Sequence, residues 1–435
     1  MKDWKTAYRE KQMDIAQAIN KVDKNHVVVL SAYCSEPQTL VEELIRQKSR
    51  LRGLELYVNL VGSPALYSQK DNFPYFCIRT FLSNPKLKEA ILYGDCDYIP
   101  INVSEIPKKI ERMEIDIAFI QVAPPDNEGF FNLGISVDYV KSLVENAKYV
   151  IAEVNDCMPR TQGDTNLTID EIDSFVKSSR SLLTIPESGF SDIEKKIGEN
   201  VATLIPDGAT LQWGIGSIPN GILHSLKNKK DLGVHSGSIS DPVIELIESG
   251  VINNSRKIVK QNKIVCTSLI GTEKLYEYAN NNPVIEMHSV EFTHNSKIIG
   301  QIENFHSINS ALEIDITGQI NAESLKGVTI AGVGGQMDFI RGAKGSNGGK
   351  AIIALPSTAA GGTISRVKFS VSGVTSLKSE VDYIVTEYGI AELFGKSMKE
   401  RGKEIIAIAH PKFREELAER LQHEITNNSD GGGVL

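Results

Sequence analysis

The chain has 435 residues and a composition typical of a soluble protein, with 41% hydrophobic and 23% charged residues. This length exceeds what one hydrophobic core usually reaches, so it predicts two or three domains and excludes a small disulfide-dependent fold. The formal net charge of −8 argues against a nucleic-acid partner, because phosphate binding needs an excess of cationic side chains.

No apolar run is long enough to cross a bilayer, and no apolar stretch follows basic residues at the N-terminus. We therefore expect no membrane partner and a cytoplasmic location. The five cysteines are scattered, without the spacing of a zinc site or a disulfide framework, so reduced thiols and no metal site are predicted. The cysteines are Cys34, Cys77, Cys96, Cys157 and Cys266.

The predicted elements alternate between helices and short apolar strands along the chain. Residues 4–19 have helical spacing and precede an apolar run at 26–30 that predicts a buried strand. Segments 38–48 and 219–227 are again helical in pattern. Such alternation predicts an α/β fold with mostly parallel sheets covered by helices. The other predicted strands are 54–58, 115–122, 149–154, 263–266, 351–355 and 383–386.

An internal repeat indicates two related domains. Residues 28–44 and 210–226 share a strand, a turn of small residues, a proline and an amphipathic helix. A second echo pairs 148–153 with 382–387 at a larger offset, so the second half would contain inserted residues. Chance similarity between two strand–turn–helix units is the alternative explanation. The predicted domains are 1–185 and 186–435.

The turn at 213–219 is the first candidate anion-binding site. It follows a predicted strand and precedes a helix, where exposed N–H groups and the helix dipole attract an anion. A tight turn also needs glycine for conformational reasons alone, so this pattern is weak by itself. The candidate binding residues are Gly214, Ile215, Gly216, Ser217 and Ile218.

The second glycine-rich site has three glycines in four residues, at 332–335. Consecutive N–H donors there can stabilise a carbonyl oxygen that becomes negative in a transition state, which makes Gly335 a candidate catalytic position. Arg341 is a candidate phosphate contact, although scattered cations in such a loop are more often solvated. The candidate binding residues are Gly332, Gly334, Gly335, Gln336 and Arg341.

Three motifs carry a resemblance to a known family. They are Gly-Ala-Thr-Leu-Gln-x-Gly-Ile-Gly-x-Ile-Pro at 208–219, Gly-Val-Gly-Gly-Gln-x-Asp-Phe-x-Arg-Gly-Ala at 332–343 and Asp-Tyr-x-Val-Thr-Glu-Tyr-Gly-Ile-Ala-Glu at 382–392. Over nearly the whole chain, the sequence resembles the acetyl-CoA hydrolase/transferase family, especially the 4-hydroxybutyrate and butyryl-CoA:acetate CoA-transferases. The resemblance implies two CoA-transferase-like domains with the active site between them. It also implies acyl-CoA and a small carboxylic acid as substrates, no permanently bound cofactor, and a homodimer or homotetramer.

The family's chemistry, as the resemblance implies it, depends on one glutamate. Its carboxylate attacks the acyl-CoA, free CoA returns to form a glutamyl-CoA thioester, and the acceptor acid reverses the sequence. That glutamate stands in a His-Ser-Glu segment followed by Ser-Asp, whereas residues 234–241 here read Val-His-Ser-Gly-Ser-Ile-Ser-Asp. Gly237 therefore occupies the nucleophile position and offers no carboxylate.

Four interpretations remain open. Glu36, in the first domain's copy of the repeated turn, is a candidate substitute nucleophile, with a helix N-terminal acid stabilised by the dipole as its alternative role. CoA can instead pass directly in a ternary complex, or His235 can activate water and make the protein an acyl-CoA hydrolase. A non-catalytic acyl-CoA-binding protein is the third interpretation. In the fourth, Gly237 makes room for a bulkier acyl group in active transferases of branched or unsaturated dicarboxylic acids such as itaconate. We rank a CoA-transferase first, a hydrolase second and a binding protein third.

Overall fold

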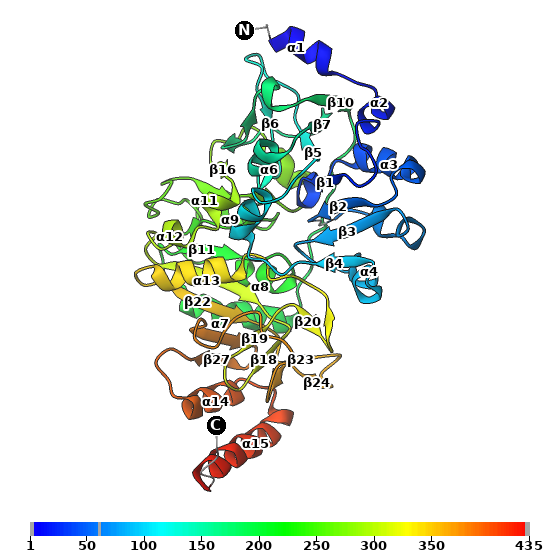
Figure 1. Cartoon of the computed structure of the whole chain (residues 1–435). Coiled ribbons are helices and arrows are strands. Elements are labelled where there is room, and N and C mark those ends of the chain that lie inside the picture. Colours follow the sequence, from blue (N-terminus) through cyan, green and yellow to red (C-terminus); the bar gives the residue numbers. More distant parts are fainter. Residues whose placement is uncertain (1–3, 60–61, 431–435) are drawn as a thin grey trace.

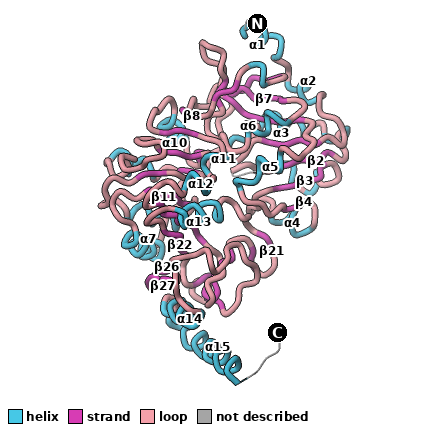
Figure 2. Tube along the Cα trace, turned by 60° about the vertical axis from the view of Figure 1, so that its left-hand side comes forward, coloured by secondary structure: helices cyan, strands magenta, loops and turns pink. Residues whose placement is uncertain are grey.

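The computed structural model describes residues 4–59 and 62–430. The two largest sheets lie one above the other along the long axis of the molecule, the first made from the N-terminal half and the second from the C-terminal half (Figure 1). Helices α1 (Trp4–Lys11) and α15 (Pro411–Asp430) lie at opposite ends of the molecule, and a second view shows the same arrangement (Figure 2).

The N-terminal half forms a seven-stranded sheet in the order β10-β7-β5-β1-β2-β3-β4, with every neighbouring pair parallel. Strands β5 and β7 are buried along their whole length, as expected for a parallel sheet covered on both faces. The strands are β1 (Val27–Leu30), β2 (Leu54–Val58), β3 (Phe76–Thr80), β4 (Cys96–Tyr98), β5 (Ile117–Val122), β7 (Val150–Asn155) and β10 (Ser174–Ser178).

The C-terminal half forms a six-stranded sheet in the order β12-β11-β17-β22-β26-β27. Its pairs are parallel except β26 with β27, which are antiparallel neighbours in the chain. The strands are β11 (Thr210–Trp213), β12 (Gly233–Val234), β17 (Phe305–Ser310), β22 (Lys350–Ala354), β26 (Tyr383–Thr386) and β27 (Gly389–Glu392).

Short strands complete the fold and connect the two halves. In a three-stranded parallel sheet, β8 (Gln162–Gly163) of the first half pairs with β16 (Ile285–Met287) of the second, which also pairs with β14 (Ile264–Cys266). The remaining strands are β6 (Phe131–Asn132), β9 (Asn166–Leu167), β13 (Ser238–Ile239), β15 (Ser268–Leu269), β18 (Glu313–Asp315), β19 (Ile320–Asn321), β20 (Ser324–Leu325), β21 (Val328–Thr329), β23 (Thr358–Ala359), β24 (Ile364–Ser365) and β25 (Val367–Lys368).

The helices begin and pack for reasons visible in the sequence. Helix α7 starts at a capping box, in which the side chains of Ser191 and Glu194 accept each other's backbone N–H groups. It crosses α8 through a glycine contact, since a Cβ on Gly198 would stand 2.3 Å from the carbonyl oxygen of Gly221. The other helices are α2 (Ile15–Ile19), α3 (Gln38–Arg46), α4 (Lys88–Tyr93), α5 (Ile106–Ile110), α6 (Val140–Asn146), α7 (Asp192–Leu204), α8 (Ser217–Ser225), α9 (Val243–Glu248), α10 (Glu273–Ala279), α11 (Val290–Thr293), α12 (Ser296–Ile299), α13 (Gln336–Gly345) and α14 (Met398–Ala407).

The predicted α/β class and the predicted strands are confirmed, whereas the single helix predicted at 4–19 is wrong. Two helices stand there, because the N–H of Met13 donates to the carbonyl of Phe175 at 2.9 Å and Asp14 caps α2. A local hydrogen bond to the sheet thus breaks a segment whose spacing is helical throughout.

The two echoes in the sequence differ in their outcome. Strand β1 followed by α3 and strand β11 followed by α8 are the predicted strand–turn–helix units, each with its strand inside a parallel sheet. The second echo does not pair equivalent strands. Only β5 separates β7 from β1, whereas β17 and β22 both separate β26 from β11. Short strand sequences resemble one another because every buried strand needs apolar β-branched residues.

The boundary proposed after residue 185 falls between β10 and α7. The halves are nevertheless packed together, since one continuous hydrophobic cluster includes Ala118 and Val122 of the first and Leu211 of the second. All five cysteines lie in the described ranges and none forms a disulfide. Within those same ranges, no helix is both long and apolar enough to span a bilayer.

Candidate active site

A cavity of about 400 Å³ opens where the two large sheets present the carboxyl ends of their strands. Tyr33 and Leu82 reach it from just beyond β1 and β3 of the first sheet. Gly214 follows β11, and Asn309 stands near the end of β17. Ligands of parallel α/β sheets usually bind outside the carboxyl ends of the strands, so this cavity is the candidate active site.

The predicted glycine loop lines this cavity through Gly332, Gly334, Gly335 and Gln336. The first half of the chain holds the loop in place. The Val333 N–H donates to Tyr98 Oη at 2.9 Å, and the Val103 N–H donates to the Gly334 carbonyl at 3.1 Å. Gly334 has a φ of 60°, in the left-handed region that favours glycine.

The loop leads into α13, whose first N–H groups have no partner within the helix. The N–H groups of Gly334 and Gly335 also donate to no acceptor in the part of the chain that is described. A carbonyl oxygen that becomes negative can bind these free N–H groups, and the predicted catalytic role of the loop stays a prediction. Arg341 lies on the exposed side of α13 and does not line the cavity.

The turn after β11 is only partly at the cavity. Gly214 and Ile215 line it, and a Cβ on Gly214 would meet no atom within 4 Å. Gly216 borders a separate small hollow, with a φ of 132° that favours glycine. Ser217 hydrogen-bonds Glu194 at 3.3 Å, and Ile218 packs against the core. The structure thus brings two of the five predicted binding residues of this turn to the cavity.

Gly237 lines the cavity, with the imidazole of His294 beside it. A Cβ on Gly237 would stand 3.0 Å from Nε2 of His294, and one on Gly335 would stand 2.6 Å from the same atom. The ring therefore lies over both glycines, with Phe339 at a centroid distance of 4.6 Å. Gly237 and Gly335 were both singled out in the sequence, and both lack a side chain where the imidazole of His294 approaches the backbone.

His294 is a site residue that the sequence reasoning missed. Burial lowers its pKa to about 3, so the imidazole is neutral at pH 7. Its Nδ1 lies 2.9 Å from the Thr293 hydroxyl, and its Nε2 faces the cavity without a partner among the described side chains and backbone. No motif or spacing marks it, because it follows Gly237 by many residues and lies at the end of a short helix.

His235 does not reach the cavity, although it stands two residues before Gly237. Its side chain is fully buried, with Nε2 3.0 Å from the Thr293 carbonyl and the ring near Phe292 and Phe305. Burial, with a smaller effect of Lys257, lowers the pKa of His235 to about 3. The activation of water by His235 stays a prediction, because the structure places its imidazole in the core.

Glu36 is also buried, at 1% exposure, and does not line the cavity. Its carboxylate accepts hydrogen bonds from Gln38, Ser63 and Tyr67 at 2.7 to 2.8 Å. Burial raises the pKa of Glu36, although these three donors oppose the increase. Its predicted role as a substitute nucleophile stays a prediction, which requires the carboxylate to leave these donors.

Among the described residues, the side chains that line the cavity include no carboxylate, lysine or arginine, and their titratable groups are Tyr33 and His294. Tyr33 has a φ of 55° and neighbours Asp138, whose φ is 40°. Burial raises the pKa of Asp138 to about 7, with hydrogen bonds from Tyr139 and Tyr33 opposing the increase. Backbone strain at two such positions is typical of a functional site.

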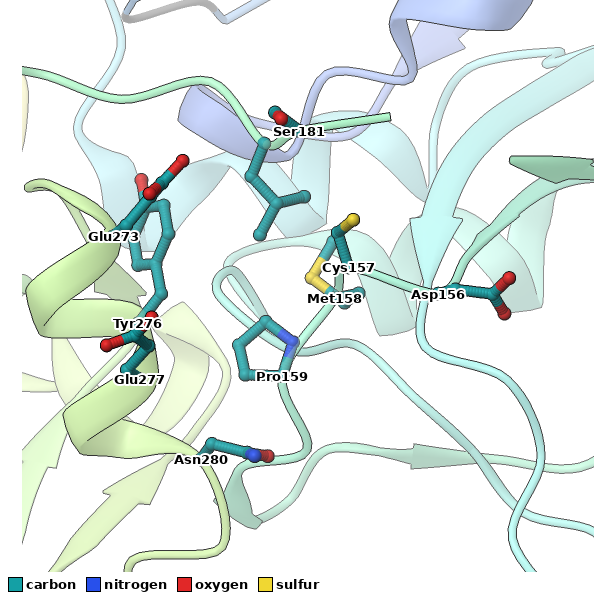
Figure 3. Close-up of a pocket in the computed structure, with 10 residues that line it drawn as sticks. Asp156, Cys157, Met158, Pro159, Ser181, Glu273, Tyr276, Glu277 and Asn280 are labelled. Atoms are coloured by element: carbon teal, nitrogen blue, oxygen red, sulfur yellow. The ribbon is translucent and has the colours of Figure 1, made fainter. Parts of the chain in front are cut away.

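A second cavity, of about 290 Å³, is lined by residues of both halves. The loop after β7, with Cys157 and Met158, faces Tyr276 and Glu277 of α10 across it (Figure 3). Its described lining residues include three carboxylates and no lysine or arginine. It would repel phosphate groups, so it is a poor candidate for a polyanionic substrate such as CoA.

A cavity between two α/β halves, with a glycine loop that presents free N–H groups, is typical of an enzyme that acts on a carbonyl group. Models of the acetyl-CoA hydrolase/transferase N-terminal and C-terminal domains match residues 1–185 and 271–421. The chain belongs to the acetyl-CoA hydrolase/transferase family.

Individual relatives agree with this membership. The chain is 44% identical to 4-hydroxybutyrate coenzyme A transferase of Clostridium kluyveri, over 95% of this chain and 98% of the relative. It is 33% identical to butyryl-CoA:acetate CoA-transferase of Anaerostipes caccae, over 96% and 98%. The solved 4-hydroxybutyrate CoA-transferase of Porphyromonas gingivalis superposes with a TM-score of 0.85 at 33% identity, over 97% of this chain and 100% of that one.

Proposed function

We propose that this protein is a CoA-transferase that moves CoA between an acyl-CoA thioester and a small carboxylic acid. One observation carries the proposal: in a chain of this family, the glycine loop and Gly237 face the same cavity. The relatives named 4-hydroxybutyrate and butyryl-CoA:acetate CoA-transferase support the same reaction class.

The reacting thioester binds at the cavity with its carbonyl oxygen toward the N–H groups of Gly334 and Gly335. Tyr98 and Val103 hold the loop through the Val333 N–H and the Gly334 carbonyl, so the two free N–H groups need no rearrangement when negative charge develops on the oxygen. A cavity of about 400 Å³ accommodates the acyl and thioester end, and the nucleotide end of CoA then lies outside it. CoA is a substrate in this proposal, and no permanently bound cofactor takes part.

Hydrolysis is the second candidate, but the geometry favours it less. A hydrolase needs a base that activates water beside the thioester, and His235 is enclosed in the core away from the cavity. His294 does reach the cavity, but burial lowers its pKa to about 3 and leaves it a weak base. We further propose a homo-oligomer and a cytoplasmic location, as the family resemblance and the absence of disulfides suggest.

One experiment separates the activities. The protein is incubated with acetyl-CoA or butyryl-CoA and a panel of acceptor acids, and new acyl-CoA and free thiol are both followed. New thioester without loss of total thioester supports the transferase, and free CoA without new thioester supports a hydrolase. Saturable acyl-CoA binding with neither product would leave a binding protein.

The same assay on Glu36→Gln tests the substitute nucleophile. Loss of transfer with an unchanged Tm would support Glu36 as the acyl carrier. Unchanged transfer would exclude that role and leave Glu36 as a buried hydrogen-bonding residue.

A further inference from the structure

A nearly buried imidazole lines the cavity with one ring nitrogen that has no hydrogen-bond partner among the described residues. His294 is 4% exposed, and no described residue hydrogen-bonds its Nε2. That atom lies 3.0 Å from where a Cβ of residue 237 would stand. Gly237 and His294 line the same cavity, so a ligand group that enters the cavity beside Gly237 can contact Nε2.

The hydrogen on this imidazole can be assigned from its neighbours. The Ser289 carbonyl already accepts from the N–H groups of Phe292 and Thr293 at 3.0 Å each. The Thr293 hydroxyl lies 3.1 Å from that carbonyl and 2.9 Å from Nδ1 of His294. Two N–H groups already occupy the two lone pairs of the Ser289 carbonyl, so we infer that the Thr293 hydroxyl donates to Nδ1 rather than to that carbonyl. The imidazole hydrogen is then on Nε2, which donates into the cavity.

We propose that His294 and Gly237 form a subsite for the carboxylate of the acceptor acid. The substrate itself then supplies the carboxylate that a glycine at position 237 lacks. This inference rests on the proposed transferase function and adds where the acceptor binds and how CoA passes. Nε2–H donates to one carboxylate oxygen, and the other oxygen faces the thioester.

The reaction balances without a residue as covalent carrier. A carboxylate oxygen of the acceptor attacks the thioester carbonyl carbon, the C–S bond breaks, and CoA leaves as a thiolate. The product is a mixed anhydride of the two acids. The thiolate then attacks the acceptor's carbonyl carbon, the C–O bond breaks, and the donor acid leaves as a carboxylate. No proton enters or leaves, so the scheme needs no acid or base in the cavity.

The lining residues fit this role. In the part of the chain that the structure describes, they include no carboxylate that could carry the acyl group and no cation that would compete with Nε2–H for the acceptor. Because burial keeps the imidazole neutral, it can hold a carboxylate without transferring a proton to it. The ring packs against the uncharged Phe339, and the Ser238 hydroxyl, which also lines the cavity, pairs with Ser268 at 2.8 Å.

The same lining indicates the class of acceptor. Leu82, Ile270 and Phe339 offer apolar walls, and the described lining residues include no lysine or arginine that could pair with a second carboxylate. An unpaired buried carboxylate is costly, so the acceptor is a monocarboxylic acid with a short apolar chain. Dicarboxylic acids such as itaconate are expected to be poor acceptors.

The wild-type protein provides the first test. Initial rates are measured with both acyl-CoA and the acceptor varied, using acetate, butyrate and succinate as acceptors. Intersecting double-reciprocal lines, no covalent adduct by intact mass after acyl-CoA alone, and a preference for monocarboxylates are expected. Parallel lines, a protein mass increased by CoA or by the acyl group, or equal use of succinate would overturn the inference while leaving the transferase function intact.

Variants of His294 provide the second test. In His294→Ala the KM for the acceptor is expected to rise roughly tenfold to a hundredfold, as for loss of a hydrogen bond to a charged group, with the KM for acyl-CoA within about twofold. His294→Gln restores an N–H donor and is expected to recover most of the affinity. His224→Ala is the matched control, because that ring lies beside Phe190 outside the cavity.

The outcomes are distinguishable from failure of the proposed function. No new acyl-CoA from the wild-type protein with any acid removes the function and this inference together. Transfer by the wild type with an unchanged acceptor KM in His294→Ala removes the inference alone. If His294→Ala does not fold, as judged by circular dichroism, the kinetic pattern, the intact mass and His294→Gln still decide.

Discussion

Replacing Gly335 by alanine tests the close packing of the imidazole over the glycine loop. The new Cβ would stand 2.5 Å from Cδ2 of His294, about 1 Å short of ordinary carbon–carbon contact. The backbone itself permits alanine, since φ is −93° at this position. Any effect of the substitution therefore comes from the ring and from the loop that must move away from it.

The ring has little room to retreat, because Phe339 packs beside it and Thr293 holds Nδ1. Overpacking of this kind costs about 1–3 kcal/mol of unfolding free energy. A shift of the loop N–H groups by about 1 Å is expected to lower kcat by roughly a hundredfold. The Tm from thermal unfolding and kcat from the transfer assay measure the two effects.

Two further variants make the result specific. Gly189→Ala is the matched control, since a Cβ there meets no atom within 4 Å, and its Tm and kcat are expected to stay unchanged. In Gly335→Ala with His294→Ala, the clash is gone, so the double variant should be more stable than additive effects predict. Strictly additive stability changes would refute the proposed contact between position 335 and the imidazole.

Three other outcomes follow from the structure. Tyr98→Phe removes the acceptor of the Val333 N–H, so it is expected to lower the unfolding free energy by about 1 kcal/mol and to raise the KM for acyl-CoA severalfold. If both quantities are unchanged, Tyr98 does not hold the glycine loop in place. Cys77 and Cys157 are exposed, so two thiols should react quickly with a thiol reagent in the native protein, and all five should react after denaturation. Burial raises the pKa of Cys266, so fast reaction of this thiol in the native protein would contradict its packing. The pKa of His294 is about 3 in the folded protein and near 6.5 in the unfolded chain, so the unfolded chain binds a proton first and this group lowers the stability as the pH falls from about 6.5 toward 3. The variant His294→Gln should therefore gain stability relative to the wild type over that pH range. A difference in Tm that does not change with pH would contradict a neutral buried imidazole.

The placement of Glu36 shows the limit of a repeat as a guide to function. The repeated turn correctly placed Glu36 beyond a buried strand, in the same kind of unit as Gly216 and Ser217. The repeat does not predict how deeply a residue is buried, and the Glu36 carboxylate accepts hydrogen bonds from Ser63 and Tyr67 instead of lining the cavity. Equivalent chain positions in two related units need not face the same solvent, because the neighbouring elements differ.

The sequence by itself determined the α/β class, the strands and the glycine loop at 332–335. Each of these depends on local patterns: apolar runs for buried parallel strands, and glycines where the backbone must bend or expose its N–H groups. The motifs at 208–219, 332–343 and 382–392 also indicated the family, which the family models confirm.

Only the tertiary structure decided which side chains share the cavity. Gly237 and Gly335 stand far apart in the chain, and they meet because His294 packs over both at the junction of the two sheets. The tertiary structure also placed Arg341 outside the cavity lining and buried His235 in the core. Such contacts depend on how helices and loops pack across the ends of parallel strands, which no local pattern encodes.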